Sequence, residues 1–311
     1  MAMFGNAHLM LLGGAASTPP ASGYPWTTRT SGADIGWSSV CYGTDKFVAV
    51  SYGGANGVMT SPDGVTAWTQ QTTTSARNWS SVCFGNGLYV AVADDPTNSV
   101  MTSSNGTSWS DSVGIVNGAW TSVCYGNGVY VAVGWLGTVM TSTNGTSWTS
   151  RTPATTNQWY GVCYGNGMFV AVSSSGTDNR VMTSSNGISW ASQTSAADNF
   201  WKSVCYGNGI FVAVSTDGGS NHVMTSTNGT SWTLQASAAD NAWNSVTYGN
   251  GVFVAVSDTG TGNRVMTSTD GINWFSRTSA ADNAWDGVAY GAGVFSAVGA
   301  SGTGNRVMTA P

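Results

Sequence analysis

Residues 201–233, WKSVCYGNGIFVAVSTDGGSNHVMTSTNGTSWT, decide the fold. WKSVCYG alternates and ends at Gly207-Asn208-Gly209, the β-branched and aromatic run IFVAVS follows, and VMTS and TSWT flank Asn228-Gly229. Asn-Gly accepts the positive φ values of a tight hairpin turn, so it is a strong hairpin signal. The stretch therefore predicts four short antiparallel strands joined by turns.

The same unit recurs about every forty residues along the chain. A first tryptophan series begins each unit, at Trp37, Trp79, Trp120, Trp159, Trp201, Trp243 and Trp285. A second series closes each unit, at Trp26, Trp68, Trp109, Trp148, Trp190, Trp232 and Trp274. Four strands in each of several units of this length are typical of a β-propeller, in which each unit is one blade.

The last unit predicts how the ring closes. It runs from Trp285 to Thr309 without a fourth strand of its own. Residues 24–30, YPWTTRT, match the fourth strand SWTSRT at 147–152. We therefore expect an all-β fold over residues 24–311, a seven-bladed β-propeller of four-stranded antiparallel blades, in which the N-terminal strand completes blade seven.

The composition excludes several functions. Charged residues make up 7% of the chain, with nine Lys and Arg, fourteen Asp and no Glu, and the net charge is -5. Binding to nucleic acid needs clustered Lys and Arg, so we expect none. The missing Glu removes the commonest carboxylate of acid–base catalysis. The five cysteines, about one repeat apart, lack metal-ligand spacing, so we expect buried thiols, no metal and no cofactor.

The hairpin between the third and fourth strands carries a resemblance. Its pattern Ser-x-Asn/Asp-Gly-x-x-Trp, as in Ser226 to Trp232, resembles the Asp-box of sialidase-like (BNR) propellers, Ser-x-Asp-x-Gly-x-Thr-Trp. The resemblance implies a structural hairpin remote from any active centre. Sialidases pair a Tyr nucleophile with Glu, and this chain has no Glu, so we expect no enzyme activity. The chain also resembles photosystem assembly propellers of the Ycf48 type, but its seven Arg are spread over the blades and do not build their arginine-rich patch.

The loops between second and third strands differ between blades, and variable loops on a rigid scaffold often bind ligands. Trp135 stands outside both tryptophan series, in the shortest of these loops. An exposed Trp can stack on a sugar ring. We predict a ligand-binding role for Trp135 with Asp94 and Asp95 of a neighbouring loop. The alternative is that Trp135 plugs the central channel or covers a blade edge.

A second group of candidates repeats from blade to blade. Arg180, Arg264 and Arg306 precede a Val-Met-Thr triplet, and His222 holds the same place in its unit. Repetition favours structural pairs with Asp198, Asp240 or Asp282 on the neighbouring loop, because a binding site normally uses unlike residues that converge once. The sugar-binding alternative assigns ligand contacts to Asn179, Arg180, Asp198, Asn221 and His222.

Residues 1–23, MAMFGNAHLMLLGGAASTPPASG, lie outside the repeat and are small and apolar. The apolar run is too short to span a bilayer, and no basic region of a signal peptide precedes it. We expect a docking segment whose contacts come from Met3, Phe4, Leu9, Met10, Leu11 and Leu12. Short apolar N-terminal pegs ahead of repetitive β domains resemble tailed-phage virion proteins.

The predicted function is a non-enzymatic phage virion protein, associated with tail or fibre, that presents the propeller to a host-surface glycan. Its partners would be other virion proteins, bound through residues 1–23, and its location the virion. Two alternatives stay open: a structural capsid-decoration or tail-cement protein, and a secreted or periplasmic lectin-like or assembly propeller. Neither nucleic-acid binding nor membrane insertion is expected.

Overall fold

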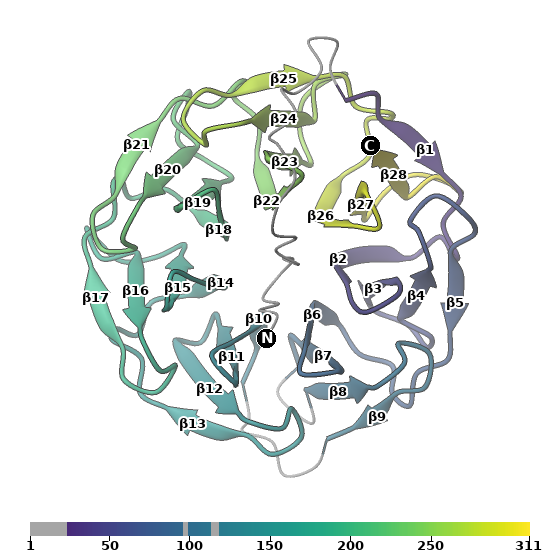
Figure 1. Ribbon diagram of the computed structural model, residues 1–311, viewed down its shortest axis with the longest axis horizontal. Helices are drawn as coiled ribbons and strands as arrows, with labels where there is room; N and C mark the ends of the chain where they lie inside the picture. Colours follow the sequence, from purple (N-terminus) through teal and green to yellow (C-terminus); the bar gives the residue numbers. More distant parts are fainter. Residues whose placement is uncertain (1–23, 96–98, 113–117) are drawn as a thin grey trace.

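The computed structural model describes residues 24–95, 99–112 and 118–311. These residues form seven four-stranded antiparallel sheets arranged in a ring, with one strand of each sheet nearest the axis (Figure 1). The predicted seven-bladed β-propeller is confirmed. In the described residues no helix is long and apolar enough to cross a membrane.

The seven blades are numbered 1 to 7 in the chain order of their innermost strands, and each blade runs from an innermost to an outermost strand. The innermost strands are β2 (Gly36–Tyr42), β6 (Trp79–Gly85), β10 (Trp120–Gly126), β14 (Trp159–Gly165), β18 (Trp201–Gly207), β22 (Trp243–Gly249) and β26 (Trp285–Gly291). The second strands are β3 (Phe47–Tyr52), β7 (Leu88–Ala93), β11 (Val129–Gly134), β15 (Met168–Ser173), β19 (Ile210–Ser215), β23 (Val252–Ser257) and β27 (Val294–Gly299). The third strands are β4 (Val58–Ser61), β8 (Val100–Ser103), β12 (Thr138–Ser142), β16 (Val181–Ser184), β20 (Val223–Ser226), β24 (Val265–Ser268) and β28 (Val307–Ala310). The outermost strands are β5 (Thr69–Gln71), β9 (Ser110–Asp111), β13 (Thr149–Arg151), β17 (Ala191–Gln193), β21 (Thr233–Gln235), β25 (Phe275–Arg277) and β1 (Thr27–Arg29).

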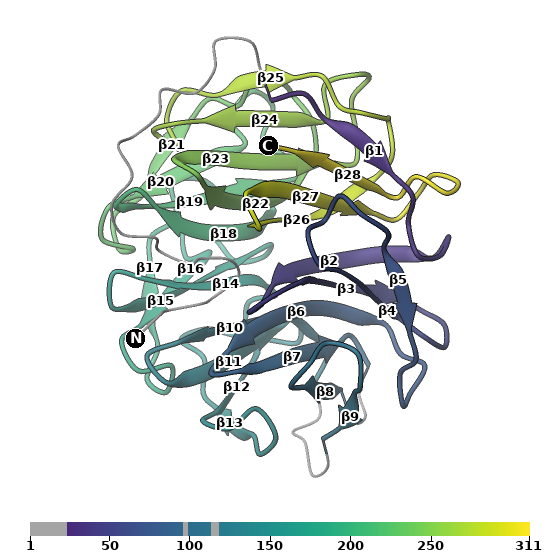
Figure 2. The ribbon, with the colours of Figure 1, turned by 45° about the vertical axis from the view of Figure 1, so that its right-hand side comes forward.

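Blade seven is built from both ends of the described chain. Strand β1 pairs antiparallel with β28, with Thr27 opposite Thr309 and Arg29 opposite Val307. Figure 2 shows β1 lying beside β28 at the edge of this blade. The predicted closure by the N-terminal strand is therefore confirmed, and its backbone hydrogen bonds hold the first described segment to the last.

The hydrophobic core lies between adjacent blades. The tryptophans of the first series are fully buried, and each joins a cluster drawn from two blades, as Trp79 of blade 2 does with Val48 and Val58 of blade 1. At the end of β14, a Cβ on Gly165 would overlap the ring of Tyr206 in the next blade. The five cysteines are free and buried, as expected. Burial of large apolar side chains at every blade junction provides the main driving force for closing the ring.

Two kinds of turn lie at one end of the ring. Between first and second strands, Asn208 and Gly209 both have positive φ, at 47° and 82°, as a type I′ turn requires. Between third and fourth strands, the Gly229 N–H donates to Ser226 Oγ at 2.8 Å, and the Trp232 indole N–H donates to the Gly229 carbonyl at 2.9 Å. The Asp-box-like hairpin is thus an internally hydrogen-bonded structural unit. The loops between second and third strands lie at the other end of the ring, which we call the loop end.

Candidate binding site at the mouth of the central channel

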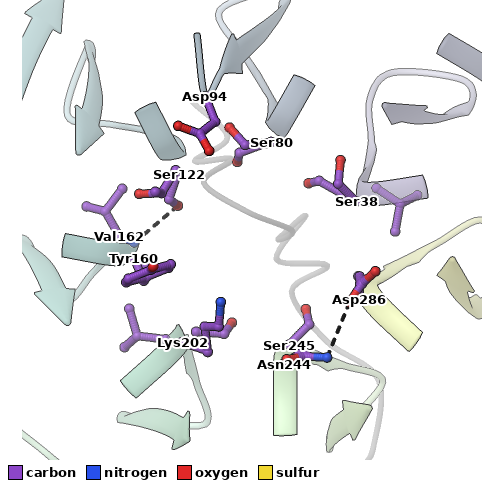
Figure 3. Close-up of a pocket in the computed structure, with 18 of the residues that line it drawn as sticks. Ser38, Ser80, Asp94, Ser122, Tyr160, Val162, Lys202, Asn244, Ser245 and Asp286 are labelled. Atoms are coloured by element: carbon purple, nitrogen blue, oxygen red, sulfur yellow. Dashed lines mark hydrogen bonds between the residues drawn. The ribbon is translucent and has the colours of Figure 1, made fainter. Parts of the chain in front are cut away.

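A cavity of about 520 Å³ lies at the mouth of the central channel (Figure 3). Each innermost strand contains a register shift just after its first-series tryptophan, as between Trp159 and Gly161. Such a bulge gives one strand an extra residue and re-aims a side chain. The residue at this position lines the cavity in every blade: Ser38, Ser80, Thr121, Tyr160, Lys202, Asn244 and Asp286.

Blades 1–3 carry hydroxyl groups at this position, and these hydroxyls serve the fold. Each donates a hydrogen bond to the backbone carbonyl of the tryptophan that begins the next blade. The bonds join Ser38 to Trp79 at 2.5 Å, Ser80 to Trp120 at 2.6 Å, and Thr121 to Trp159 at 2.7 Å. The wall formed by blades 1–3 is called the hydroxyl half.

Blades 4–7 carry four unlike residues at the same position, Tyr160, Lys202, Asn244 and Asp286, which form the mixed half. The Lys202 ammonium lies 4.2 Å from the centre of the Tyr160 ring, a cation–π geometry. The Asn244 amide donates to Asp286 Oδ1 and to the Trp285 carbonyl, both at 3.3 Å. Phe200 meets Tyr160 edge-on, with ring centres 6.0 Å apart. One phenol, one ammonium, one amide and one carboxyl group therefore occur once each on this wall.

The mixed half perturbs the acid–base behaviour of its charged groups. Burial, and then repulsion from Asp258, raises the pKa of Asp286 to about 7, although Lys202 acts in the opposite direction. Burial lowers the pKa of Lys202, and the attraction of Asp286 and Asp258 opposes this. Desolvation disfavours the charged form of both groups. Asp286 therefore changes charge near neutral pH.

Aromatic side chains complete the cavity at the loop end. Trp135 is 38% exposed and Tyr52 is 48% exposed, and both line the cavity. The Trp135 indole N–H donates to Asp94 Oδ1 at 2.8 Å, which fixes the ring across the junction of blades 2 and 3. Two of the predicted ligand-binding residues, Trp135 and Asp94, are thus brought together. Trp135 therefore lines the cavity at the channel mouth and does not fill it.

Trp135 lies in the loop between β11 and β12, as expected, and its backbone position has an equivalent in every blade. It lies outside the tryptophan series, but its position recurs in the other blades as the residue that ends or follows the second strand. Its N–H donates to the carbonyl of Ala119, as the N–H of Asp94 does to Asn78. The equivalent residues are Tyr52, Asp94, Ser174, Thr216, Asp258 and Ala300. Trp135 is therefore one member of a second ring of unlike residues.

The remaining loop candidates are held in contacts between adjacent loops. Arg180 forms an ion pair with Asp198 at 3.5 Å and donates to the carbonyls of Ser174 and Asn199. The same ion pair recurs as Arg264 with Asp282 and as Arg306 with Asp34, both at 3.7 Å. The predicted structural pairing of these repeated charges is confirmed. Asp95 likewise pairs with Arg77, at 3.3 Å.

His222 and the two loop asparagines are also held by neighbouring loops. His222 is 1% exposed, and its ring nitrogens lie 3.1 Å from the Ser215 carbonyl and 2.8 Å from Asp240 Oδ1. The carbonyls of Asn179 and Asn221 accept hydrogen bonds from the side chains of Asn157 and Asn199. None of these residues lines the cavity at the channel mouth. A ligand-binding role for them stays a prediction.

The predicted docking segment, residues 1–23 with Met3, Phe4, Leu9, Met10, Leu11 and Leu12, lies outside the described residues. Sequence reasoning missed Tyr160, Lys202, Asn244 and Asp286. The signal was present, because the residue after each first-series tryptophan changes while its neighbours repeat: WSS, WSS, WTS, WYG, WKS, WNS and WDG.

Comparisons with known proteins show the class of fold. The chain matches no protein-family model and no curated protein sequence. Among solved structures it is similar to YCF48 bound to D1 peptide, with 15% identity, a TM-score of 0.71, and coverage of 94% of this chain and 97% of that one. It is also similar to virginiamycin B lyase from Staphylococcus aureus, with 9% identity, a TM-score of 0.77, and coverage of 93% and 99%.

A third similar structure is the Swd1 (Cps50) propeller domain from Myceliophteria thermophila, with 9% identity, a TM-score of 0.68, and coverage of 92% and 100%. At these identities the likeness shows the fold alone. The chain is a seven-bladed β-propeller, and its structural neighbours include a peptide-bound propeller and a lyase. The fold supports several functions, so the function has to be argued from the site.

Proposed function

We propose that this chain is a non-enzymatic recognition protein that binds a glycan at the mouth of its central channel. The observation that carries the proposal is the mixed half, where Tyr160, Lys202, Asn244 and Asp286 occupy a position that holds hydroxyls in the other blades. A repeated scaffold that carries unlike residues at one converging position has the pattern expected of a binding site.

The chemistry of the mouth suits a sugar. The exposed aromatic side chains of Trp135 and Tyr52 can stack on the apolar face of a pyranose ring. The amide of Asn244 and the carboxylates of Asp94 and Asp286 supply hydrogen-bonding groups for sugar hydroxyls. A concave site with aromatic walls and a few polar groups is the usual form of a small-ligand pocket.

The contacts within the cavity support binding over catalysis. Asp94 is engaged by the Trp135 indole, and Asp286 accepts a hydrogen bond from Asn244. In the described part of the chain the one histidine is His222. It is buried against Asp240 in a contact between loops and does not line the cavity. A general base has to reach the proton that it removes. Because Asp94 is held by Trp135 and no histidine is among the described residues that line the cavity, Asp286 lacks a second acid–base group of the kind that glycoside hydrolysis uses, which favours binding without cleavage.

The virion setting predicted from the sequence belongs to this proposal. Residues 1–23 would attach the propeller to other virion proteins and leave the loop end free for the host surface. A chain with 7% charged residues and an apolar N-terminal segment suits such an attachment. Removal of residues 1–23 should abolish incorporation into particles while the isolated propeller keeps its ligand, and normal incorporation would contradict the virion role.

The test of the binding site is a glycan-array and host-cell binding screen with the full chain and Trp135→Ala. We expect binding that weakens about tenfold or more in the variant, because a stacking aromatic is a typical hot spot. Ile272→Ala is the matched control, since Ile272 is 48% exposed in a hairpin at the opposite end of the ring. Equal losses in both variants, no sugar binding, or release of cleaved sugar would each overturn the proposal.

A further inference from the structure

The mixed half and the neighbouring Asp258 together carry more negative charge than Lys202 balances. Asp286 lies on the cavity wall, and Asp258 is close enough to raise its pKa. Asp258 Oδ1 is buried and has no hydrogen-bond partner among the described residues. Lys202 supplies one positive charge against these two carboxylates, so one negative charge remains when all three groups are ionised.

Lys202 does not neutralise Asp286 directly. Its ammonium lies over the Tyr160 ring, and within the described part of the chain Asp286 forms no ion pair. The hydrogen-bond partner that the structure gives Asp286 is the Asn244 amide, at 3.3 Å. A half-buried carboxylate that accepts one long hydrogen bond retains lone pairs for a further donor.

Electrostatic complementarity therefore selects the ligand. A cationic ligand would offset the remaining negative charge, whereas an anionic ligand would increase the repulsion. Asp94, next to Trp135, is the second carboxylate of the cavity lining. The cavity thus combines aromatic surfaces with an excess of carboxylates.

We propose that the channel mouth binds a sugar with a free amino group, whose ammonium donates to the Asp286 carboxylate while its ring stacks on Trp135. This inference rests on the proposed glycan-binding function. An amino sugar combines the two features that the cavity matches, an apolar ring face and a single cation. The ligand enters from the loop end, where Trp135 and Tyr52 are exposed.

The experiment is a calorimetric titration of the full chain at pH 7.5, which is above the pKa of about 7 of Asp286, and at 0.15 M salt, where distant surface charges are screened. The probes are glucosamine and 6-amino-6-deoxyglucose, compared with glucose and N-acetylglucosamine. We expect at least one amino sugar to bind about tenfold more tightly than the neutral sugars, because a charge-assisted hydrogen bond is stronger than one between neutral groups.

Two variants test whether the Asp286 carboxylate causes the preference for amino sugars. Asp286→Asn keeps the shape of the side chain and removes its charge, so the preference for amino sugars should disappear. Ile272→Ala, in the hairpin between β24 and β25 at the opposite end of the ring, should keep that preference. Equal binding of neutral and amino sugars, or a preference that survives Asp286→Asn, would overturn this inference and leave the glycan site standing. If no sugar binds, or only a lysine-containing peptide binds, the inference and the proposed function both fail.

Discussion

The two halves of the channel wall differ most in the residue that follows each first-series tryptophan. In the hydroxyl half that residue bonds to the next blade, as Ser80 does to the Trp120 carbonyl at 2.6 Å. In the mixed half Asn244 keeps a longer version of this bond, at 3.3 Å to Trp285. Within the described residues, Tyr160, Lys202 and Asp286 make no such bond. The position that stabilises the ring in three blades carries other side chains in the remaining four. This is the pattern expected if the proposed ligand selects those four residues.

The blade junctions behind the wall are the same in both halves. The glycine that ends an innermost strand is covered by a ring of the next blade, as Gly85 is by Tyr125 in the hydroxyl half and Gly165 is by Tyr206 in the mixed half. The comparison therefore separates two uses of one scaffold. The junctions hold the fold and vary little, whereas the four positions of the mixed half vary because they contribute little to the contacts between blades.

The largest expected effect is at these junctions. In both Gly85→Ala and Gly165→Ala the added Cβ would overlap the neighbouring tyrosine ring, so each variant should lose about 3 kcal/mol or more of unfolding free energy. The measurement is chemical denaturation followed by tryptophan fluorescence. A loss in Gly85→Ala alone would show that the mixed half packs loosely, and would contradict the common junction.

A smaller effect is expected from the pH dependence of Asp286. Its pKa is about 7 in the folded protein and 3.8 for a fully solvated aspartate side chain, so the folded state binds more protons between these values. The stability that depends on this carboxyl is therefore present at low pH and is lost as pH rises from about 4 to 7. A displacement of this size corresponds to about 4 kcal/mol, and relaxation in the open mouth reduces the expected loss to about 2 kcal/mol.

The control for this prediction is Asp286→Asn, which cannot ionise. The difference in unfolding free energy between the native protein and this variant should change across pH 4–7 and be flat above about 8. Taking the difference removes the contributions of other carboxyls, such as Asp270, whose backbone hydrogen bonds hold its pKa at about 2. A constant difference from pH 4 to 8 would show that Asp286 is well solvated in the mouth.

The sequence predicted the scaffold much better than the mouth. Tryptophan spacing and Asn-Gly turns determine strand number and blade count locally, and the match between residues 24–30 and 147–152 was enough to predict the closure confirmed by β1 and β28. Repetition also identified the Arg180–Asp198 pair as structural. These features depend on contacts within a blade or between neighbouring blades, so the residues that form them recur in each repeat of the sequence.

The mixed half was missed for a physical reason. In a regular strand, alternation fixes which side chains face the core, but the bulge after Trp159 or Trp201 gives the next residue a different direction. The sequence pattern therefore did not indicate that the side chains of Tyr160 and Lys202 face the cavity. Trp135 could be predicted as a site residue because it stands outside both tryptophan series. The structure places it at the mouth, at a backbone position that recurs in the other blades.

The smallest expected effect is the loss of unfolding free energy when one residue of each half is replaced by alanine. Ser80→Ala removes a buried hydroxyl that bonds to the carbonyls of Val92 and Trp120, so it should cost about 1 kcal/mol of unfolding free energy and leave ligand binding unchanged. Asn244→Ala should cost less, because its bond to the Trp285 carbonyl is long and part-exposed, yet it should weaken binding. Denaturation and titration of both variants give the two readouts. If Ser80→Ala weakened binding as much as Asn244→Ala does, the hydroxyl half would belong to the site, and the division of the wall between fold and ligand would be wrong.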